Sequence, residues 1–395
     1  MQLSSETREF IRNHAADEVR KLALQADKYP GVDMQMAICQ IAGRQTAAEK
    51  LPSWYGNEEI LYPAHLPLEQ CSSEITARYK ASLVHGDRLV DLTGGFGIDC
   101  SFMGANFGHV TYVERNAGLC ELALHNFSAL GLDHICVVNQ DSVDYLSEMR
   151  EVDCIYIDPA RRNRHGGKTF LISDCEPDVE KLEDVLLQKA HTVLIKLSPM
   201  LDLSLAMSKL SRVAEAYVVS VKNECKEVLL LLKRDNSVGA ASRYVPVHCV
   251  NILSNESVQR FSFSFLTEKE SVCGFADEPE EFLYEPNASI LKAGAFRNIA
   301  QQFSLRKLHP NSHLYTSERF IEDFPGRKFR VCAYGSLKDK SITKDMVKAN
   351  VSTRNFPLSA PELRKRLKLQ EGGDTYIFGT TLNNDKRILI IAEKC

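Results

Sequence analysis

Four acidic residues recur along the first half of the chain, each at or just after a short apolar run. They are Asp91, Glu114, Asp141 and Asp158. A single acid after a strand is usually a helix cap that accepts main-chain N–H groups. Parallel strands, however, bring their carboxyl ends to one edge of a sheet, where ligands bind. Four such acids in succession are harder to explain as caps alone and predict a carboxylate-rich ligand pocket.

A glycine-rich turn follows the first acid, in the run Asp91-Leu92-Thr93-Gly94-Gly95-Phe96-Gly97. A strand, a tight glycine turn and a helix start are typical of the opening of a nucleotide-binding βαβ unit. We expect the glycines to let a ligand approach the main chain. Glu114 lies twenty residues beyond Gly94, the spacing at which an acid binds ribose hydroxyls. A plain structural turn remains the alternative, and Cys100 replaces the third glycine of the dinucleotide fingerprint, which disfavours NAD.

A basic segment follows the fourth acid. It begins Asp158-Pro159-Ala160-Arg161-Arg162 and continues through Arg164 to Lys168. These cations could bind phosphates beside an active site. The alternative is a solvated loop with ion pairs to Glu176 or Asp178.

Alternating strands and helices must position these residues. Apolar runs predict strands at 89–92, 110–113, 136–138, 154–157 and 193–195, with helices between them. Two further runs, 216–221 and 228–232, lie too close together for a crossover helix. They predict an antiparallel pair at the sheet edge. The expected fold is α/β, a mostly parallel Rossmann-like sheet with helices on both faces.

The length of 395 residues predicts about two to four domains. Residues 1–66 have a helical pattern, and the alternating pattern occupies 67–235. Residues 236–323 form a connecting α+β region, in which 245–252 and 261–265 predict strands of a different element. Residues 324–395 combine strands with a basic helix at 361–368.

Composition narrows the class of protein. No apolar run approaches ~18 residues, the length that spans a membrane. The cysteines form no Cys-x-x-Cys pair, which argues against zinc and iron–sulfur sites, so we predict no metal. Cys136 and Cys154 lie in apolar runs and are interpreted as small core residues. With no apolar leader at the start, these features predict a reducing cytoplasm.

Charge is distributed unevenly along the chain. Residues 324–395 contain fifteen Lys/Arg against seven Asp/Glu, a balance of +8, whereas the rest of the chain carries −12. A basic terminal region on an acidic body indicates a polyanionic partner. A solvated basic face is the alternative.

The turn and the strand-end acids together resemble those of the class I S-adenosylmethionine-dependent methyltransferases, over about 72–234. The resemblance implies S-adenosyl-L-methionine as the cofactor. Asp91, Thr93 and the turn at Gly94, Gly95 and Gly97 would hold its methionine part. Glu114 would bind the ribose hydroxyls and Asp141 the adenine amino group.

The resemblance also implies where the substrate lies. Asp158, Pro159 and Arg161 would face the reacting group, with Arg162, Lys168 and Lys196 as substrate-binding residues. The amino-directed pattern Asn/Asp-Pro-Pro-Tyr/Phe has no aromatic counterpart here, because Ala160 and Arg161 follow Pro159. A nucleophilic cysteine, present in uracil-C5 enzymes, is also missing from the run 196–200. The methylated atom is therefore left open.

Residues 324–395 resemble the THUMP-like domain of certain bacterial methyltransferases, through 353–357, 361–369 and 371–376. The stretch 284–294 is similar to the ferredoxin-like portion that precedes it. THUMP domains are associated with RNA, so the resemblance implies an RNA partner, with Arg354 and Arg364 among the binding residues. Lys365, Arg366 and Lys368 are further candidates, although not all of them can share one helix face.

These observations predict a cytoplasmic methyltransferase that acts on a base in RNA, such as rRNA or tRNA. One alternative is methylation of a protein or small molecule, with the basic region serving oligomerisation. The other is an inactive methyltransferase domain that only binds RNA. The oligomeric state is left open.

Overall fold

The structure is a computed structural model that describes residues 3–161, 171–235, 242–344 and 346–395. Two of the predicted substrate-binding residues, Arg162 and Lys168, lie outside these ranges. Among the described residues, no helix is both long enough and apolar enough to cross a membrane.

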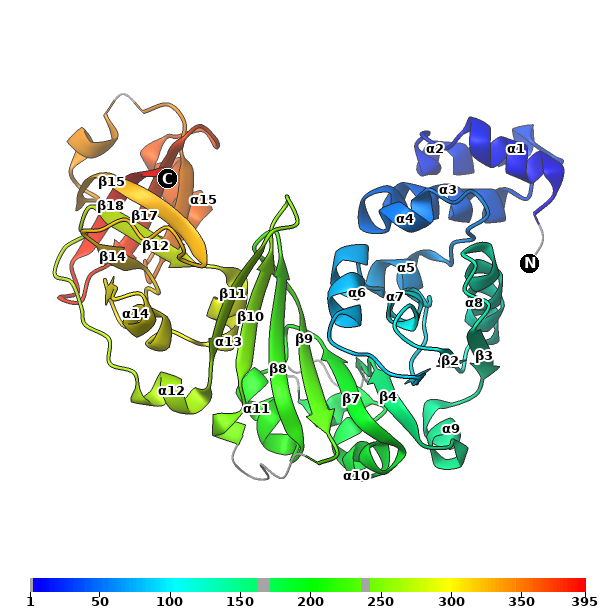
Figure 1. The fold of residues 1–395 in the computed structure, drawn as a ribbon. Helices are drawn as coiled ribbons and strands as arrows, with labels where there is room; N and C mark the ends of the chain where they lie inside the picture. Colours follow the sequence, from blue (N-terminus) through cyan, green and yellow to red (C-terminus); the bar gives the residue numbers. More distant parts are fainter. Residues whose placement is uncertain (1–2, 162–170, 236–241, 345) are drawn as a thin grey trace. The chain divides into compact units, whose positions relative to one another are not determined.

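Short helices occupy the first part of the chain, as predicted (Figure 1). They are α1 (Ser5–Asn13), α2 (Val19–Ala23), α3 (Met34–Lys50), α4 (Pro52–Tyr55), α5 (His65–Gln70) and α6 (Glu74–Ala81). Asp33 caps α3 and Ser73 caps α6, each through a side-chain oxygen that accepts a main-chain N–H. Trp54 packs edge-on against Phe96 of the glycine turn, with ring centroids 5.1 Å apart. These helices therefore support the turn.

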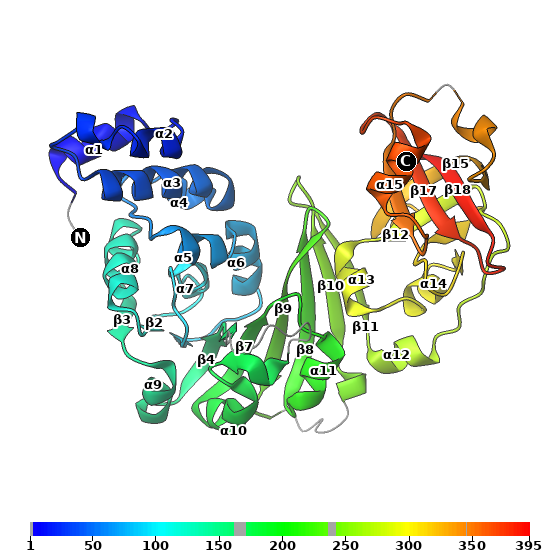
Figure 2. The ribbon, with the colours of Figure 1, turned by 180° about the vertical axis from the view of Figure 1, so that it is seen from behind.

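Strands and helices then alternate. They are β1 (Arg88–Asp91), α7 (Ile98–Gly104), β2 (His109–Glu114), α8 (Ala117–Ala129), β3 (Ile135–Asn139), α9 (Ser142–Glu148), β4 (Val152–Ile157), β5 (Ala160–Arg161), β6 (Cys175–Glu176), α10 (Val179–Lys189), β7 (Ala190–Leu197) and α11 (Leu203–Lys209). The predicted strands all occur. Seen from behind, α10 and α11 lie in front of the sheet (Figure 2).

The large sheet has nine strands in the order β11-β10-β8-β9-β7-β4-β1-β2-β3. The outer part consists of β8 (Val213–Val221), β9 (Glu224–Lys233), β10 (Val247–Ile252) and β11 (Val258–Phe263). Neighbours from β7 to β3 pair in parallel. This arrangement confirms the predicted Rossmann-like α/β class.

The predicted position of the β8–β9 hairpin at the sheet edge is wrong. β10 pairs in parallel with β8, from Val247 opposite Ala216 to Ile252 opposite Val221, and β11 adds an antiparallel edge strand. The prediction of a different element for β10 and β11 is therefore also wrong. Beyond the polar break at 233–237, the chain returns to the same sheet, a step that leaves no local sequence signal.

The prediction that Cys136 is a small core residue is wrong. Cys136 lies on the edge strand β3 and is exposed, so it is not the core residue that the sequence predicts. Cys154 lies on the central strand β4 and is buried, as predicted, and burial raises the pKa of its thiol.

The chain divides into two compact units, and the boundary between them passes through β8 and β9. The first unit comprises 1–214 and 229–240, and the second comprises 215–228 and 241–395. The predicted domain boundaries at 66, 235 and 323 stay predictions.

The second unit contains a seven-stranded sheet in the order β13-β14-β12-β15-β18-β17-β16. Its elements are α12 (Phe265–Glu270), β12 (Phe282–Pro286), α13 (Ala288–Ala293), α14 (Asn298–Gln302), β13 (Arg306–Lys307), β14 (Tyr315–Ser317), β15 (Gly326–Ser336), β16 (Asn350–Arg354), α15 (Ala360–Leu367), β17 (Thr375–Thr381) and β18 (Arg387–Lys394). Phe329 and Phe378 meet in its core, with ring centroids 5.0 Å apart.

Candidate active site

The glycine turn joins β1 to α7 and is held by main-chain hydrogen bonds. The Gly94 N–H donates to the Val113 carbonyl of β2 over 2.9 Å, and the Gly97 N–H donates to the Gly94 carbonyl over 2.8 Å. Gly95 and Gly97 have φ angles of +55° and +86°, a region that favours glycine. The turn is thus fixed between two neighbouring strands.

The sequence predicts that Gly94 lets a ligand approach the main chain. The structure adds a second reason for a glycine here, because the protein interior leaves no space for a side chain. A Cβ at this position would lie 2.2 Å from Cε2 of Tyr112. The Tyr112 hydroxyl donates to the Gly95 carbonyl over 2.6 Å, so the ring is fixed beneath the turn. At Gly95, by contrast, a Cβ would meet only the Thr93 carbonyl oxygen, at 3.8 Å. The open side of the turn therefore lies at Gly95.

Asp91 ends β1 and is 1% exposed. Its Oδ1 accepts the Thr93 N–H over 3.0 Å. Burial raises the pKa of Asp91 well above its usual range, and the negative charges of Asp99, Asp158 and Glu114 add to the effect. A cationic ligand in this pocket would favour the charged form of Asp91.

Glu114 and Asp141 lie at the ends of the next two strands, where the sequence predicts them. Glu114 accepts the Gly95 N–H through Oε2 over 3.0 Å and the Asn116 N–H through Oε1 over 2.8 Å. Asp141 caps α9, with Oδ1 accepting the Val143 N–H over 2.8 Å. Both side chains are half-buried, so part of each carboxylate remains accessible.

Asp158 follows β4 and contacts Thr93 and Lys196 in the site. Its N–H donates to the Thr93 Oγ1 over 2.7 Å, which joins the end of β4 to the turn. Its Oδ2 forms an ion pair and hydrogen bond with the ammonium of Lys196 at the end of β7. The structure thus brings Lys196, predicted to bind substrate, into contact with Asp158. The adjacent Pro159 is buried.

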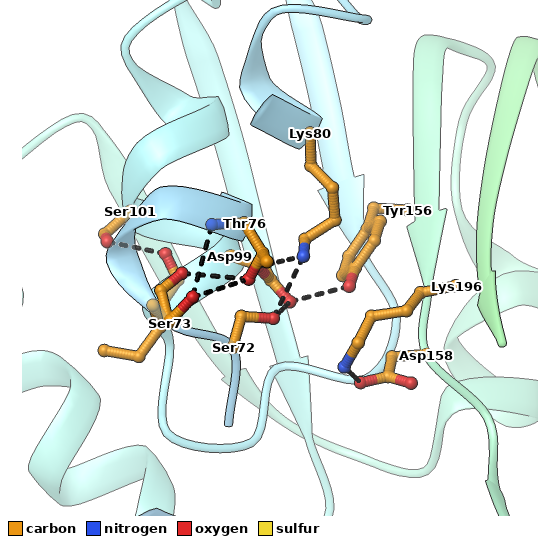
Figure 3. A network of polar contacts seen from close by, with 10 residues as sticks. Ser72, Ser73, Thr76, Lys80, Asp99, Ser101, Tyr156, Asp158 and Lys196 are labelled. Carbon is orange, nitrogen blue, oxygen red and sulfur yellow. Dashed lines mark hydrogen bonds and ion pairs between the residues drawn. The ribbon is translucent and has the colours of Figure 1, made fainter. Parts of the chain in front are cut away.

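A buried polar network surrounds the first turn of α7, the helix that follows the glycine turn (Figure 3). At its centre, Asp99 on α7 accepts the hydroxyls of Ser72 and Tyr156 through Oδ2, over 2.8 and 2.7 Å. Lys80 Nζ lies 3.2 Å from Asp99 Oδ1 and donates to the Ser72 Oγ over 3.0 Å. Burial acts to raise the pKa of Asp99, but Lys80, Lys196 and the two hydroxyls outweigh it, so the pKa is lowered.

The sequence interpretation missed Lys80 and Asp99. Lys80 is completely buried, although a lysine within a helix is normally exposed. Asp99 stands in the first turn of α7, where an acid is commonplace. The only local signal was the position of Asp99 two residues after Gly97.

The basic segment after Asp158 is described only at its start. Arg161 lies in β5, whose main chain pairs with β6, Arg161 opposite Cys175. The alternative interpretation, ion pairs of these cations with Glu176 or Asp178, stays a prediction, because Arg162, Arg164 and Lys168 lie outside the described residues. Glu176 pairs with Arg115 over 3.5 Å, and Asp178 pairs with Lys181 over 3.0 Å.

Two of the arginines predicted to bind RNA, Arg354 and Arg364, make ion pairs within the second unit. Arg354 donates to Glu285 Oε1 through Nε and Nη2, over 3.0 and 2.9 Å. Glu285, whose side chain is 2% exposed, also pairs with Arg327. Arg364 pairs with Glu371. Their role in binding stays a prediction, and each has a structural role in addition.

Acids at four successive strand ends, beside a glycine turn on a sheet of this order, define a class I methyltransferase. Comparison with solved structures agrees. The chain is 35% identical to a protein of Porphyromonas gingivalis W83 whose crystal structure is assigned to a methyltransferase, with a TM-score of 0.88 and coverage of 98% of this chain and 97% of that one. Family models match a ferredoxin-like domain at 282–325 and a THUMP domain-like region at 326–394.

The chain therefore belongs to the family of class I S-adenosylmethionine-dependent methyltransferases with a C-terminal THUMP-like domain, as its sequence predicted.

Two other solved structures are similar over less than half of this chain. An rRNA methylase from Streptococcus thermophilus is 13% identical, with a TM-score of 0.31, and covers 43% of this chain and 98% of its own. TrmK of M. capricolum, in complex with S-adenosyl-homocysteine, is 11% identical, with a TM-score of 0.30, and covers 41% of this chain and 68% of its own. No curated protein matches.

Proposed function

We propose that this enzyme transfers a methyl group from S-adenosyl-L-methionine to a nitrogen of an RNA base. The observation that carries the proposal is the arrangement of Asp158. Its main chain is bound to Thr93 in the glycine turn, and its side chain is held by Lys196. A carboxylate fixed in this way, beside a cofactor cradle, is suited to contact the reacting group of the substrate.

The residues of the turn fit the cofactor. The open side of the turn at Gly95 leaves space for the ligand, and the buried Asp91 supports a positive charge. Asp91, Thr93, Gly94, Gly95 and Gly97 would hold the methionine part of the cofactor. The accessible parts of Glu114 and Asp141 would bind its ribose and adenine.

The chemistry is a displacement that depends mainly on positioning. When bound, S-adenosyl-L-methionine supplies an electrophilic methyl group and keeps the electrons of the broken carbon–sulfur bond. Asp158 accepts a hydrogen bond from the target N–H and so orients the nitrogen lone pair. After the nitrogen–carbon bond has formed, Asp158 accepts the proton that the nitrogen loses, while Lys196 holds the carboxylate in place.

RNA as the substrate is supported by the THUMP domain-like region and by its charge of +8. Lys365 and Arg366, in the last turn of α15, and Lys368, which caps it, are all exposed. We assign phosphate contacts to these three residues, which would make binding sensitive to salt.

Calorimetry tests the cofactor. The protein should bind S-adenosyl-L-methionine, and Asp91→Ala should weaken binding at least about tenfold, because the variant removes a charge of opposite sign to the sulfonium. Asp153→Ala is the matched control, since Asp153 accepts the N–H groups of Asp87 and Arg88 at the amino end of β1. Equal binding by the wild type and Asp91→Ala would overturn the cofactor site.

Mass spectrometry of RNA nucleosides tests the substrate. A strain lacking the gene should lack one methylated nucleoside that its parent contains, and the gene on a plasmid should restore it. The same plasmid with Asp158→Ala should not restore it. Identical nucleosides in the deletion strain and its parent would contradict RNA methylation.

A further inference from the structure

Asp99 connects three parts of the chain that surround the turn. Lys80 reaches it from α6, Ser72 from the segment before α6, and Tyr156 from β4. The side chains of Lys80 and Asp99 are 0% and 11% exposed. Because they are shielded from water, their attraction is stronger than that of a surface ion pair.

Lys196 belongs to the same group of polar side chains as this buried carboxylate, and its ammonium contacts Asp158 (Figure 3). Its ammonium binds the Asp158 carboxylate, and its charge also stabilises the charged form of Asp99. The register of β4 and β7 continues from Ile157 opposite Ile195, which places Asp158 and Lys196 next to each other. Two carboxylates thus attract one ammonium.

We propose that Lys80 is a positioning residue, which neutralises the buried Asp99 carboxylate and so keeps Lys196 on Asp158. Lys80 supplies the ion-pair partner of Asp99, so that Lys196 is not drawn inward and remains at the strand end. The inference rests on the proposed function in one respect, since Asp158 is the residue that contacts the target.

The inference predicts opposite effects for the two halves of the buried pair. In Lys80→Met the Asp99 carboxylate loses its ion-pair partner and attracts Lys196 away from Asp158. In Asp99→Asn the inward attraction is removed, and Lys196 stays on Asp158. Both variants lose stability, because each leaves one buried charge without its partner. A purely structural role predicts no difference in activity between them.

The experiment measures methyl transfer from labelled S-adenosyl-L-methionine to total RNA of the deletion strain, per mole of folded protein. We expect Lys80→Met to lower kcat about tenfold or more while the KM for S-adenosyl-L-methionine changes little. Asp99→Asn should keep kcat within about threefold of the wild type. The double variant Lys80→Met/Asp99→Asn should recover both stability and kcat, because it leaves no buried charge unpaired.

A control and a second readout keep the test decisive. Glu183 on α10 is a buried carboxylate that accepts the N–H groups of Ser211 and Arg212, away from the turn. Glu183→Gln should lower stability but not kcat. A crystal structure of Lys80→Met should show the Lys196 ammonium moved from Asp158 towards Asp99.

Failure of the inference is distinguishable from failure of the proposed function. Equal kcat losses in Lys80→Met and Asp99→Asn, or Lys196 unmoved in the Lys80→Met crystal, would overturn the inference alone. Absence of methyl transfer by the wild type would overturn the proposed function, and the crystal structure would still decide the position of Lys196.

Discussion

Gly94→Ala tests whether the turn is built on the ring of Tyr112. The added Cβ would lie 2.2 Å from Cε2 and 2.5 Å from Cδ2 of that ring, closer than the 3.0 Å below which one of the two must move. The ring is completely buried, and its hydroxyl is bound to the Gly95 carbonyl, so it cannot turn away cheaply. The turn and the ring must therefore separate.

Two effects add up to the expected loss in the free energy of unfolding of Gly94→Ala. Overpacking a buried site costs about 1–3 kcal/mol. Loss of the hydrogen bond from the Tyr112 hydroxyl adds roughly 1 kcal/mol. Gly95→Ala is the matched control, because its Cβ meets only the Thr93 carbonyl oxygen at 3.8 Å. It costs about 1–2 kcal/mol, the penalty for placing alanine at a positive φ.

Urea denaturation followed by circular dichroism measures both variants. We expect a free energy of unfolding about 2–4 kcal/mol lower for Gly94→Ala, a larger loss than for Gly95→Ala. Tyr112→Leu should make room, so that Gly94→Ala costs less in that background than in the wild type. An equal or smaller loss for Gly94→Ala than for Gly95→Ala would refute the reasoning.

Four further predictions concern charges and hydrogen bonds. Asp91 has a raised pKa in the folded protein, so its ionisation destabilises the fold as pH rises through that pKa. Asp91→Asn should therefore gain stability relative to the wild type as pH rises, in thermal unfolding across pH without cofactor. Arg354→Ala should lower the free energy of unfolding by about 1–2 kcal/mol, because a buried carboxylate loses one of its two arginines. Arg366→Ala should leave stability unchanged but reduce the salt dependence of RNA binding in filter-binding titrations. A loss of stability in Arg366→Ala together with unchanged stability in Arg354→Ala would contradict the roles assigned to these two arginines. Thr93→Val should lower kcat, because the Asp158 N–H loses its acceptor, whereas Thr93→Ser should retain it; equal kcat values would refute this role.

The sequence predicted the parts of the fold that rest on local patterns. Apolar runs followed by acids predict the central strands, and the acids at 91, 114, 141 and 158 lie at or just after the strand ends. The pairing of β10 with β8 could not be predicted, because it depends on where the chain goes after a polar break.

The sequence predicts the strand-end acids and the glycine turn of the site but not the buried residues around them. Lys80 is buried next to Asp99, which comes from another helix and neutralises the lysine there. Gly94 was identified from its spacing, but the reason for it, the ring of Tyr112, comes from the next strand. The charge of Arg354 predicts a role in binding, but its partner Glu285 stands sixty-nine residues away in the sequence. Each of these contacts is tertiary, and no local pattern encodes it.

Transfer of labelled methyl groups from S-adenosyl-L-methionine to total RNA of a deletion strain tests the central claim most directly. The wild-type protein should label RNA and not protein in a mixture of both, and Asp158→Ala should label neither. Label in protein alone, or equal labelling of RNA by the wild type and Asp158→Ala, would contradict the account.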